Sequence, residues 1–162
     1  METAYLALGG NIGNVSATFD LAIQKIMAKI GAIRVESSRY RTEPWGNKNQ
    51  DDFLNMVLAV DTPLPAEAVL ATIMDIEKMM GRNRDQDNRN APRTIDIDIL
   101  FYGHEIINND QLVIPHPRLH LRNFVLTPLR EIAPEFIHPT LNKNMEELFA
   151  ERPDHSMVQI VE

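Results

Sequence analysis

Two aspartates lie two residues apart in an otherwise aliphatic segment, RTIDIDIL, at residues 93–100. In a β-strand, successive side chains point to opposite faces, so Asp96 and Asp98 would share one face about 7 Å apart, with the neighbouring isoleucines facing the core. Two carboxylates this close repel each other unless a cation lies near them, and hard oxygen ligands suit Mg²⁺ better than Zn²⁺. The same alternation is equally typical of a strand whose polar face is only solvated, so the spacing leaves both interpretations open.

An arginine-rich segment runs directly into this strand. Residues 82–93, RNRDQDNRNAPR, include Arg82, Arg84, Arg89 and Arg93. The planar guanidinium group matches phosphate oxygens, and a loop of such groups beside metal ligands can close over a polyphosphate. Considered alone, the segment fits better with a surface loop whose arginines pair with its own aspartates. Its position next to the acidic pair favours a phosphoryl-transfer site.

A histidine between two prolines opens the segment PHPRLHLRNF, residues 115–124. The prolines hold His116 in a rigid extended turn, and Arg118 and Arg122 follow within one helical reach. A lone histidine is more often structural than catalytic, but this one could donate to a phosphate. His116 and His120 have the spacing of a helical zinc pair, which the flanking prolines argue against, so zinc is not supported.

A third group of residues could recognise a planar ligand. The turn RTEPWG at residues 41–46 is followed by Phe53 and Asn55, which share a strand face. A ligand rich in donors and acceptors needs an aromatic to stack on and an amide to read its edge, and Phe53, Asn55 and Phe124 could provide both. Each aromatic by itself is more often a core residue.

Hydrophobic periodicity predicts the elements that must position these groups. They are a strand at 3–8, a helix from the N-cap Ser16 to Gly31, strands at 33–41 and 53–61, a helix between Pro65 and Gly81, the strand of the two aspartates, a hairpin at 104–115, and short helices near 121–132 and 144–150. The order βαββαβ predicts an α+β, ferredoxin-like fold, with a mainly antiparallel sheet and helices packed on one face. The other face would be free for a site.

Composition narrows the class of protein. A chain of 162 residues, 44% hydrophobic, suits one domain spanning 1–162. It has no cysteine for a disulfide, and its formal charge of −7 argues against a nucleic-acid binder. No apolar run approaches the roughly 20 residues of a membrane span, so we expect a cytoplasmic protein without membrane partners. The start at Met1 and the lack of a linker favour a stand-alone protein, and we expect a monomer.

Several motifs together carry a resemblance to a known family. RTEPWG, FLN, GR-x-R, APRTIDIDIL and VIPHPRLHLRNFVLTPLREIAP, in this order and at these intervals, resemble 6-hydroxymethyl-7,8-dihydropterin pyrophosphokinases of folate biosynthesis, from AYLALGGNIG to about Pro139. The resemblance implies a ferredoxin-like α/β/α sandwich that binds ATP and two Mg²⁺ ions. It also implies transfer of the β,γ-pyrophosphoryl unit to the pterin hydroxymethyl group, with release of AMP.

The resemblance also implies roles for individual residues. Asp96 and Asp98 match the metal ligands. Arg82 and Arg93 match arginines that assist transfer. The ATP-binding positions are Glu77, Arg84, Ile99, His116 and Arg122. The pterin-binding positions are Thr42, Glu43, Trp45, Phe53, Asn55 and Phe124.

The chain departs from the family pattern at a few positions. Asn90 replaces an aromatic that closes over the site, so we expect weaker closure of the arginine loop or a different latch. Phe53 replaces a familiar tyrosine, Gly10 a serine, and Gln111 an arginine that contacts ATP in some members.

Two other classes of function stay open from the residues alone. A metal-dependent phosphodiesterase or nuclease could also use an Asp-x-Asp pair, although the net charge and the lack of a broad basic face count against it. A non-catalytic ferredoxin-like module could bind a small ligand with the acidic pair incidental.

Overall fold

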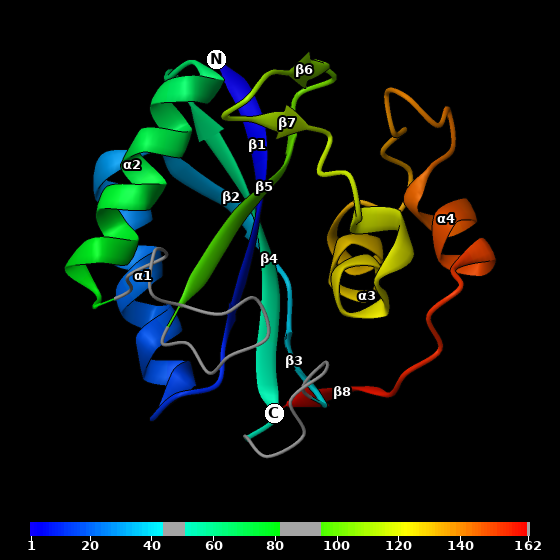
Figure 1. The fold of residues 1–162 in the computed structure, drawn as a ribbon, viewed down its shortest axis with the longest axis horizontal. Helices are drawn as coiled ribbons and strands as arrows, with labels where there is room; N and C mark the ends of the chain where they lie inside the picture. The colour runs from blue at the N-terminus through cyan, green and yellow to red at the C-terminus, as the bar shows by residue number, and fades with distance from the viewer. Residues whose placement is uncertain (44–50, 82–94, 162) are drawn as a thin grey trace.

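The computed structural model describes residues 1–43, 51–81 and 95–161, and these form one sheet with helices on both sides (Figure 1). The helices are α1 (Val15–Lys29), α2 (Ala66–Met79), α3 (Asn123–Ile132) and α4 (Met145–Glu151), with a 3₁₀ turn, η1 (Leu119–Leu121). The strands are β1 (Glu2–Gly10), β2 (Ala32–Glu36), β3 (Arg39–Thr42), β4 (Phe53–Thr62), β5 (Asp96–Tyr102), β6 (Ile107–Asn108), β7 (Val113–Ile114) and β8 (Val158–Val161).

The main sheet has the strand order β5-β1-β4-β3-β8, and β2 also pairs with β4. Every strand pairing among the described residues is antiparallel, and β6 and β7 form the predicted hairpin. Helices α1 and α2 cover one face, and α3 and α4 lie on the other (Figure 1). The ferredoxin-like α+β prediction is therefore confirmed.

Alternation along the central strands builds the larger core. Leu6 and Leu8 of β1 and Met56 and Leu58 of β4 are at most 1% exposed and pack with α1 and α2. Ile97 of β5 joins the same core, as its place between the two aspartates predicted. The core side chains thereby hold the aspartates on the opposite face.

A second core lies on the other face, which is not left open as the sequence suggested. Val57 and Phe101 of the sheet pack there with Leu126 and Leu129 of α3. These apolar groups would lose their burial in an uncovered sheet, so α3 covers part of this face. The site is confined to the part that α3 leaves accessible.

The elements differ from the prediction at three places. Helix α1 has its N-cap at Asn14, whose side chain accepts from the N–H of Ala17, and not at Ser16. The strand expected at 33–41 is two strands, because the Ser37 hydroxyl accepts the N–H of Val57 and interrupts the ladder. Strand β8 was not predicted at all; it pairs with β3 from the far end of the chain.

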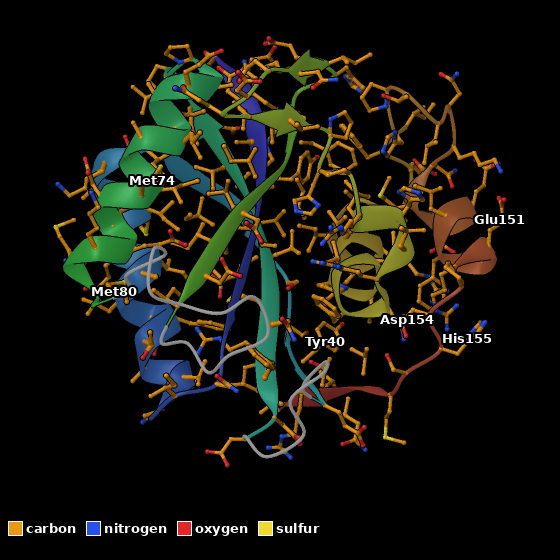
Figure 2. All side chains as sticks on the ribbon, in the orientation of Figure 1. Tyr40, Met74, Met80, Glu151, Asp154 and His155 are labelled. Carbon is orange, nitrogen blue, oxygen red and sulfur yellow. The ribbon has the colours of Figure 1, made fainter. Side chains whose placement is uncertain are left out.

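Two long-range hydrogen bonds fix the position of α3, and Figure 2 labels one residue of each, Tyr40 and Asp154. The Tyr40 hydroxyl donates to Glu131 at 2.6 Å, which joins β3 to the last turn of α3. At the other end, Asp154 accepts the N–H of Asn123 at 3.0 Å and so caps the helix. Burial opposes ionisation of Asp154, but hydrogen bonds from Ser156 and Asn123 outweigh it and hold its pKa below the usual range. The start of α3, which carries Phe124, is thus fixed.

His138 is a buried histidine in the segment between α3 and α4. It is 4% exposed, and its ring packs against Phe101. Its Nδ1 accepts the N–H groups of Thr140 and Leu141, and burial, helped by the charge of His120, lowers its pKa to about 4. The unfolded chain takes up this proton near pH 6.5, whereas the folded chain does so near 4. Stability is therefore complete above pH 6.5 and falls as the pH drops towards 4.

We expect the melting temperature to fall by several degrees between pH 7 and pH 4.5, with a smaller fall in His138→Asn. The asparagine Oδ1 can replace Nδ1 as the acceptor but does not titrate. The pKa of His116 is also lowered, so the melting temperature of the variant still depends partly on pH. Melting curves at a series of pH values check this, and equal slopes in both proteins would contradict it.

No helix among the described residues combines the length and the hydropathy that crossing a membrane requires.

Candidate active site

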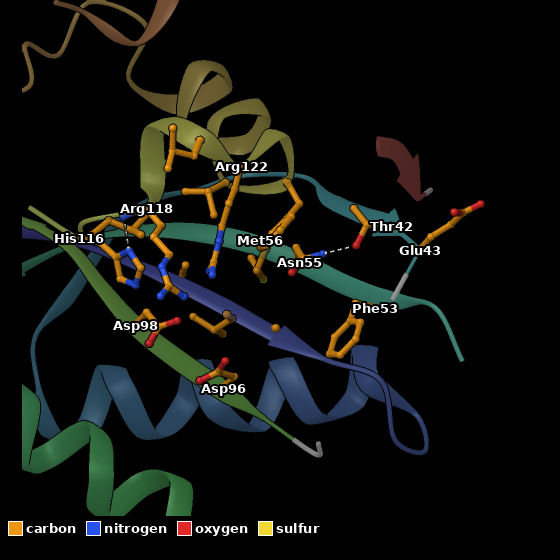
Figure 3. Close-up of a pocket in the computed structure, with 17 residues that line it drawn as sticks. Thr42, Glu43, Phe53, Asn55, Met56, Asp96, Asp98, His116, Arg118 and Arg122 are labelled. Atoms are coloured by element: carbon orange, nitrogen blue, oxygen red, sulfur yellow. Dashed lines mark hydrogen bonds between the residues drawn. The ribbon is translucent and has the colours of Figure 1, made fainter. Parts of the chain in front are cut away.

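A cavity of about 560 Å³ lies between the sheet and the segment that leads into α3 (Figure 3). Strands β1, β3, β4 and β5 form its floor, and residues 116–125 form the opposite wall. The lining residues are Ala7, Leu8, Gly9, Thr42, Glu43, Phe53, Asn55, Met56, Asp96, Asp98, Leu100, His116, Arg118, Leu121, Arg122, Phe124 and Val125. The cavity therefore collects most of the predicted site residues that the structure describes.

The two aspartates lie on the floor, half-buried, with both carboxylates on the cavity face of β5 (Figure 3). Their partners on β1 are small: Gly9 pairs with Asp96, and Ala7 pairs with Asp98. Side chains of this size do not cover the carboxylates, which stay accessible to a ligand. The prediction that Asp96 and Asp98 share one face of the strand is confirmed.

Glu77 supports this strand from beneath. It is 2% exposed on α2, and its Oε2 accepts the N–H of Ile97 at 2.8 Å. Strand β5 is an edge of the sheet, so its outward N–H groups need partners from outside the ladder. Glu77 does not line the cavity, and the structure places it next to the backbone between the two aspartates.

His116 lies beside β5, since its N–H donates to the carbonyl of Leu100 in that strand at 3.0 Å. Its Nδ1 accepts the N–H of Arg118 at 3.2 Å, which leaves the proton of the neutral ring on Nε2. Burial and the charge of Arg122 lower the pKa of His116 to about 4, although Asp96 opposes them. At neutral pH the side chain is an uncharged hydrogen-bond donor.

Arg118 and Arg122 extend from the same wall toward the floor (Figure 3). Arg122 is the predicted one, and its guanidinium also lies 5.6 Å from the ring centre of Phe124. Arg118 was not predicted as a site residue, although its position two residues after His116 was a usable signal. The cavity thus places cationic groups opposite anionic ones, as a site for a metal-bound polyphosphate requires.

The other end of the cavity is built for recognition. Asn55 and Thr42 are 8% and 7% exposed, and the Asn55 Nδ2 donates to the Thr42 Oγ1 at 2.9 Å. The Thr42 hydroxyl proton is thereby turned away from Asn55 and can be donated elsewhere. A Cβ at Gly9 would lie only 3.2 Å from the Asn55 Oδ1, so glycine leaves room for that amide. Phe53, Phe124 and Glu43 line this end as well.

A second cavity, of about 340 Å³, meets the first at Asp98 and His116. Its other lining residues are mainly apolar: Leu70, Met74, Ile97, Ile99, Gln111, Leu112, Val113 and Pro117. Ile99, predicted to bind ATP, lies here and not in the larger cavity. The predictions for Trp45, Arg82, Arg84 and Arg93, and for weaker closure or a different latch at Asn90, lie outside the described residues.

Comparisons with known proteins show the family of this chain. Residues 5–134 match the sequence model of the family 7,8-dihydro-6-hydroxymethylpterin-pyrophosphokinase (HPPK). The chain is 44% identical over 139 residues to the 2-amino-4-hydroxy-6-hydroxymethyldihydropteridine pyrophosphokinase of Methylorubrum extorquens, covering 85% of this chain and 86% of that one. It is 39% identical to the enzyme of the same name from Aquifex aeolicus, covering 97% and 94%.

The fold has a solved counterpart in an HPPK-DHPS protein of Plasmodium falciparum, with a TM-score of 0.77 and 18% sequence identity. The match covers 93% of this chain and 43% of that larger chain, and at this identity it bears on the fold alone. The family match and the two bacterial relatives carry the assignment: this chain belongs to the 7,8-dihydro-6-hydroxymethylpterin-pyrophosphokinase family.

Proposed function

We propose that this chain transfers a diphosphate unit from ATP to the hydroxymethyl group of 6-hydroxymethyl-7,8-dihydropterin, giving the pterin diphosphate and AMP in folate synthesis. One observation carries the proposal: a single cavity joins the Asp96–Asp98 pair and the His116 turn to a buried amide and hydroxyl flanked by aromatic residues. Membership of the family supports it. We also propose that residues 1–162 act as one domain, since both cores share one sheet.

The pterin occupies the end of the larger cavity that contains Asn55 and Thr42. A pterin ring is planar and has alternating donors and acceptors along its edge, which an amide and a hydroxyl can read together. Phe53 and Phe124 offer aromatic surface for the ring faces. Glu43 and Trp45, which follow Thr42 in the chain, complete this end in the proposal.

ATP spans the junction of the two cavities. The adenosine lies in the smaller, mainly apolar one beside Ile99, and the phosphates extend past Asp98 and His116 into the larger one. The Nε2–H of His116 and the guanidinium of Arg122 then donate to phosphate oxygens. Arg84 contributes from its loop. Glu77 acts indirectly, through the backbone of β5, and this support by the buried carboxylate is how we interpret its predicted link to ATP.

The residues present fit Mg²⁺. Asp96 and Asp98 supply two hard oxygen ligands. The described part of the chain has no cluster of three or more His, Cys, Asp or Glu side chains of the kind that would surround a metal ion with protein ligands alone. Mg²⁺ typically uses one or two carboxylates and takes its remaining ligands from water and substrate phosphates. When bound, the ions, two of them in our proposal, neutralise phosphate charge during transfer.

The chemistry is mainly positioning and electrostatics. The pterin hydroxyl oxygen forms a bond to the β-phosphorus while the bond from that phosphorus to the oxygen bridging the α-phosphate breaks. AMP leaves with the bridging oxygen, and the hydroxyl proton passes to solvent. Asn55 and Thr42 orient the acceptor, His116 and Arg122 hold the donor, and Arg82 and Arg93 offset the charge that develops on AMP.

The direct test is to incubate the protein with ATP, Mg²⁺ and 6-hydroxymethyl-7,8-dihydropterin and to measure AMP. We expect AMP and the pterin diphosphate in equal amounts, and no AMP when the pterin is left out. ADP in place of AMP would indicate transfer of one phosphoryl group and would contradict the proposal. The absence of any pterin-dependent product would favour a binding module.

A further inference from the structure

Arg118 lines the larger cavity, and the proposed function gives it no role. It lies immediately before η1, two residues after His116, and its N–H donates to the His116 Nδ1 at 3.2 Å. This contact fixes the start of the side chain relative to the histidine. Arg118 lines the larger cavity but not the smaller one, whereas its neighbour Pro117 lines only the smaller.

The guanidinium group of Arg118 makes no hydrogen bond or ion pair with another part of the described chain. Other arginines behave differently: Arg34, Arg39 and Arg130 each pair with a carboxylate at 3.1 Å or less. Figure 3 shows the Arg118 side chain extending from the His116 turn toward Asp98. An unpaired planar fork above a pair of carboxylates is suited to an anion lying between them, and a phosphoryl group matches its geometry.

The position of Arg118 indicates which phosphates it meets. The two cavities share Asp98 and His116, so a donor that crosses this junction has its nucleoside on one side and its terminal phosphates on the other. Arg118 is on the side of the acceptor, with Thr42 and Asn55. The phosphates in the larger cavity are then the β- and γ-phosphates, which move to the acceptor, and the AMP portion lies in the smaller cavity.

We propose that Arg118 binds the diphosphate unit that is transferred, and not the AMP portion of ATP. This assignment rests on the proposed function, because it takes the larger cavity as the acceptor side. It makes Arg118 a residue that distinguishes nucleoside triphosphates from monophosphates. The same contact persists in the pterin diphosphate after AMP has left.

The test compares two ligands in the wild-type protein and in Arg118→Gln. One ligand is an ATP analogue with a methylene bridge between the α- and β-phosphates, which cannot transfer its diphosphate, and the other is AMP; both are titrated with Mg²⁺ by calorimetry. Because Arg118→Gln loses a charge-assisted contact, its affinity for the analogue should be about tenfold or more below that of the wild type. AMP affinity should stay unchanged. Arg118→Lys keeps the charge but not the planar guanidinium group, so its affinity for the analogue should lie between those of the wild type and Arg118→Gln.

Arg34→Gln is the matched control, since Arg34 is an exposed arginine of β2 outside both cavities and its replacement removes the same charge. It should bind both ligands as the wild type does. Equal weakening of AMP and the analogue by Arg118→Gln, or no weakening of either, would overturn the assignment. A selective loss of the analogue in a protein that forms no pterin-dependent AMP would support the phosphate contact and overturn the proposed reaction.

Discussion

Asp98→Asn is expected to lower turnover about a thousandfold or more while leaving the fold intact. Among the residues that the structure describes, Asp98 is the one carboxylate that lines both cavities, so the proposed function places it where the nucleotide and the acceptor meet. Asparagine has nearly the same shape but no negative charge, and a neutral amide is a poor ligand for Mg²⁺. The variant should melt like the wild type, because the half-buried side chain faces the cavity and the neighbouring isoleucines hold the strand.

The measurement is pterin-dependent AMP formation at saturating ATP, repeated over a range of Mg²⁺ concentrations. Asp75→Asn serves as the control, since Asp75 is exposed on α2 and lines neither cavity. It removes the same charge and should keep full activity. A well-folded Asp98→Asn protein that retained a tenth of wild-type turnover would rule out Asp98 as a required ligand.

Asn55→Ala is expected to lower kcat/KM for the pterin roughly a hundredfold, through the loss of about two hydrogen bonds at a buried site. The substitution removes the amide that would read the pterin edge, and it leaves the Thr42 hydroxyl without its present donor. Binding of the ATP analogue should not change, because Asn55 lies beside Thr42, away from the Asp98 and His116 junction that the proposed phosphates occupy (Figure 3). The loss should therefore be specific to the acceptor.

Steady-state kinetics with the pterin varied, and calorimetry with the ATP analogue, separate the two effects. Thr42→Val tests the partner of Asn55; it keeps the side-chain shape, and we expect a smaller loss. Asn108→Ala is the control, since Asn108 is an exposed residue of β6 outside the cavity. An Asn55→Ala enzyme with an unchanged kcat/KM for the pterin would place the acceptor elsewhere.

Local patterns predicted the elements that carry the aspartates. Strict alternation in RTIDIDIL places Ile97 in the core and the aspartates on the other face, because a strand has a period of two. Longer apolar patterns located α1 and α2 in the same way. Boundaries were less predictable, because the N-cap at Asn14 and the break at Ser37 depend on single hydrogen bonds that a periodic pattern does not encode.

The acidic strand, the rigid histidine turn, the fold class and the family could all be predicted from the sequence, since each follows from residues close together or from their order. How these parts meet was visible only in the folded chain. Folding paired small residues of β1 with the aspartates, set Glu77 behind the strand and brought Arg118 into the larger cavity. It also paired β8 with β3. The reason is physical: these contacts join residues far apart in the chain, and packing and hydrogen-bond geometry, which no local pattern records, select them.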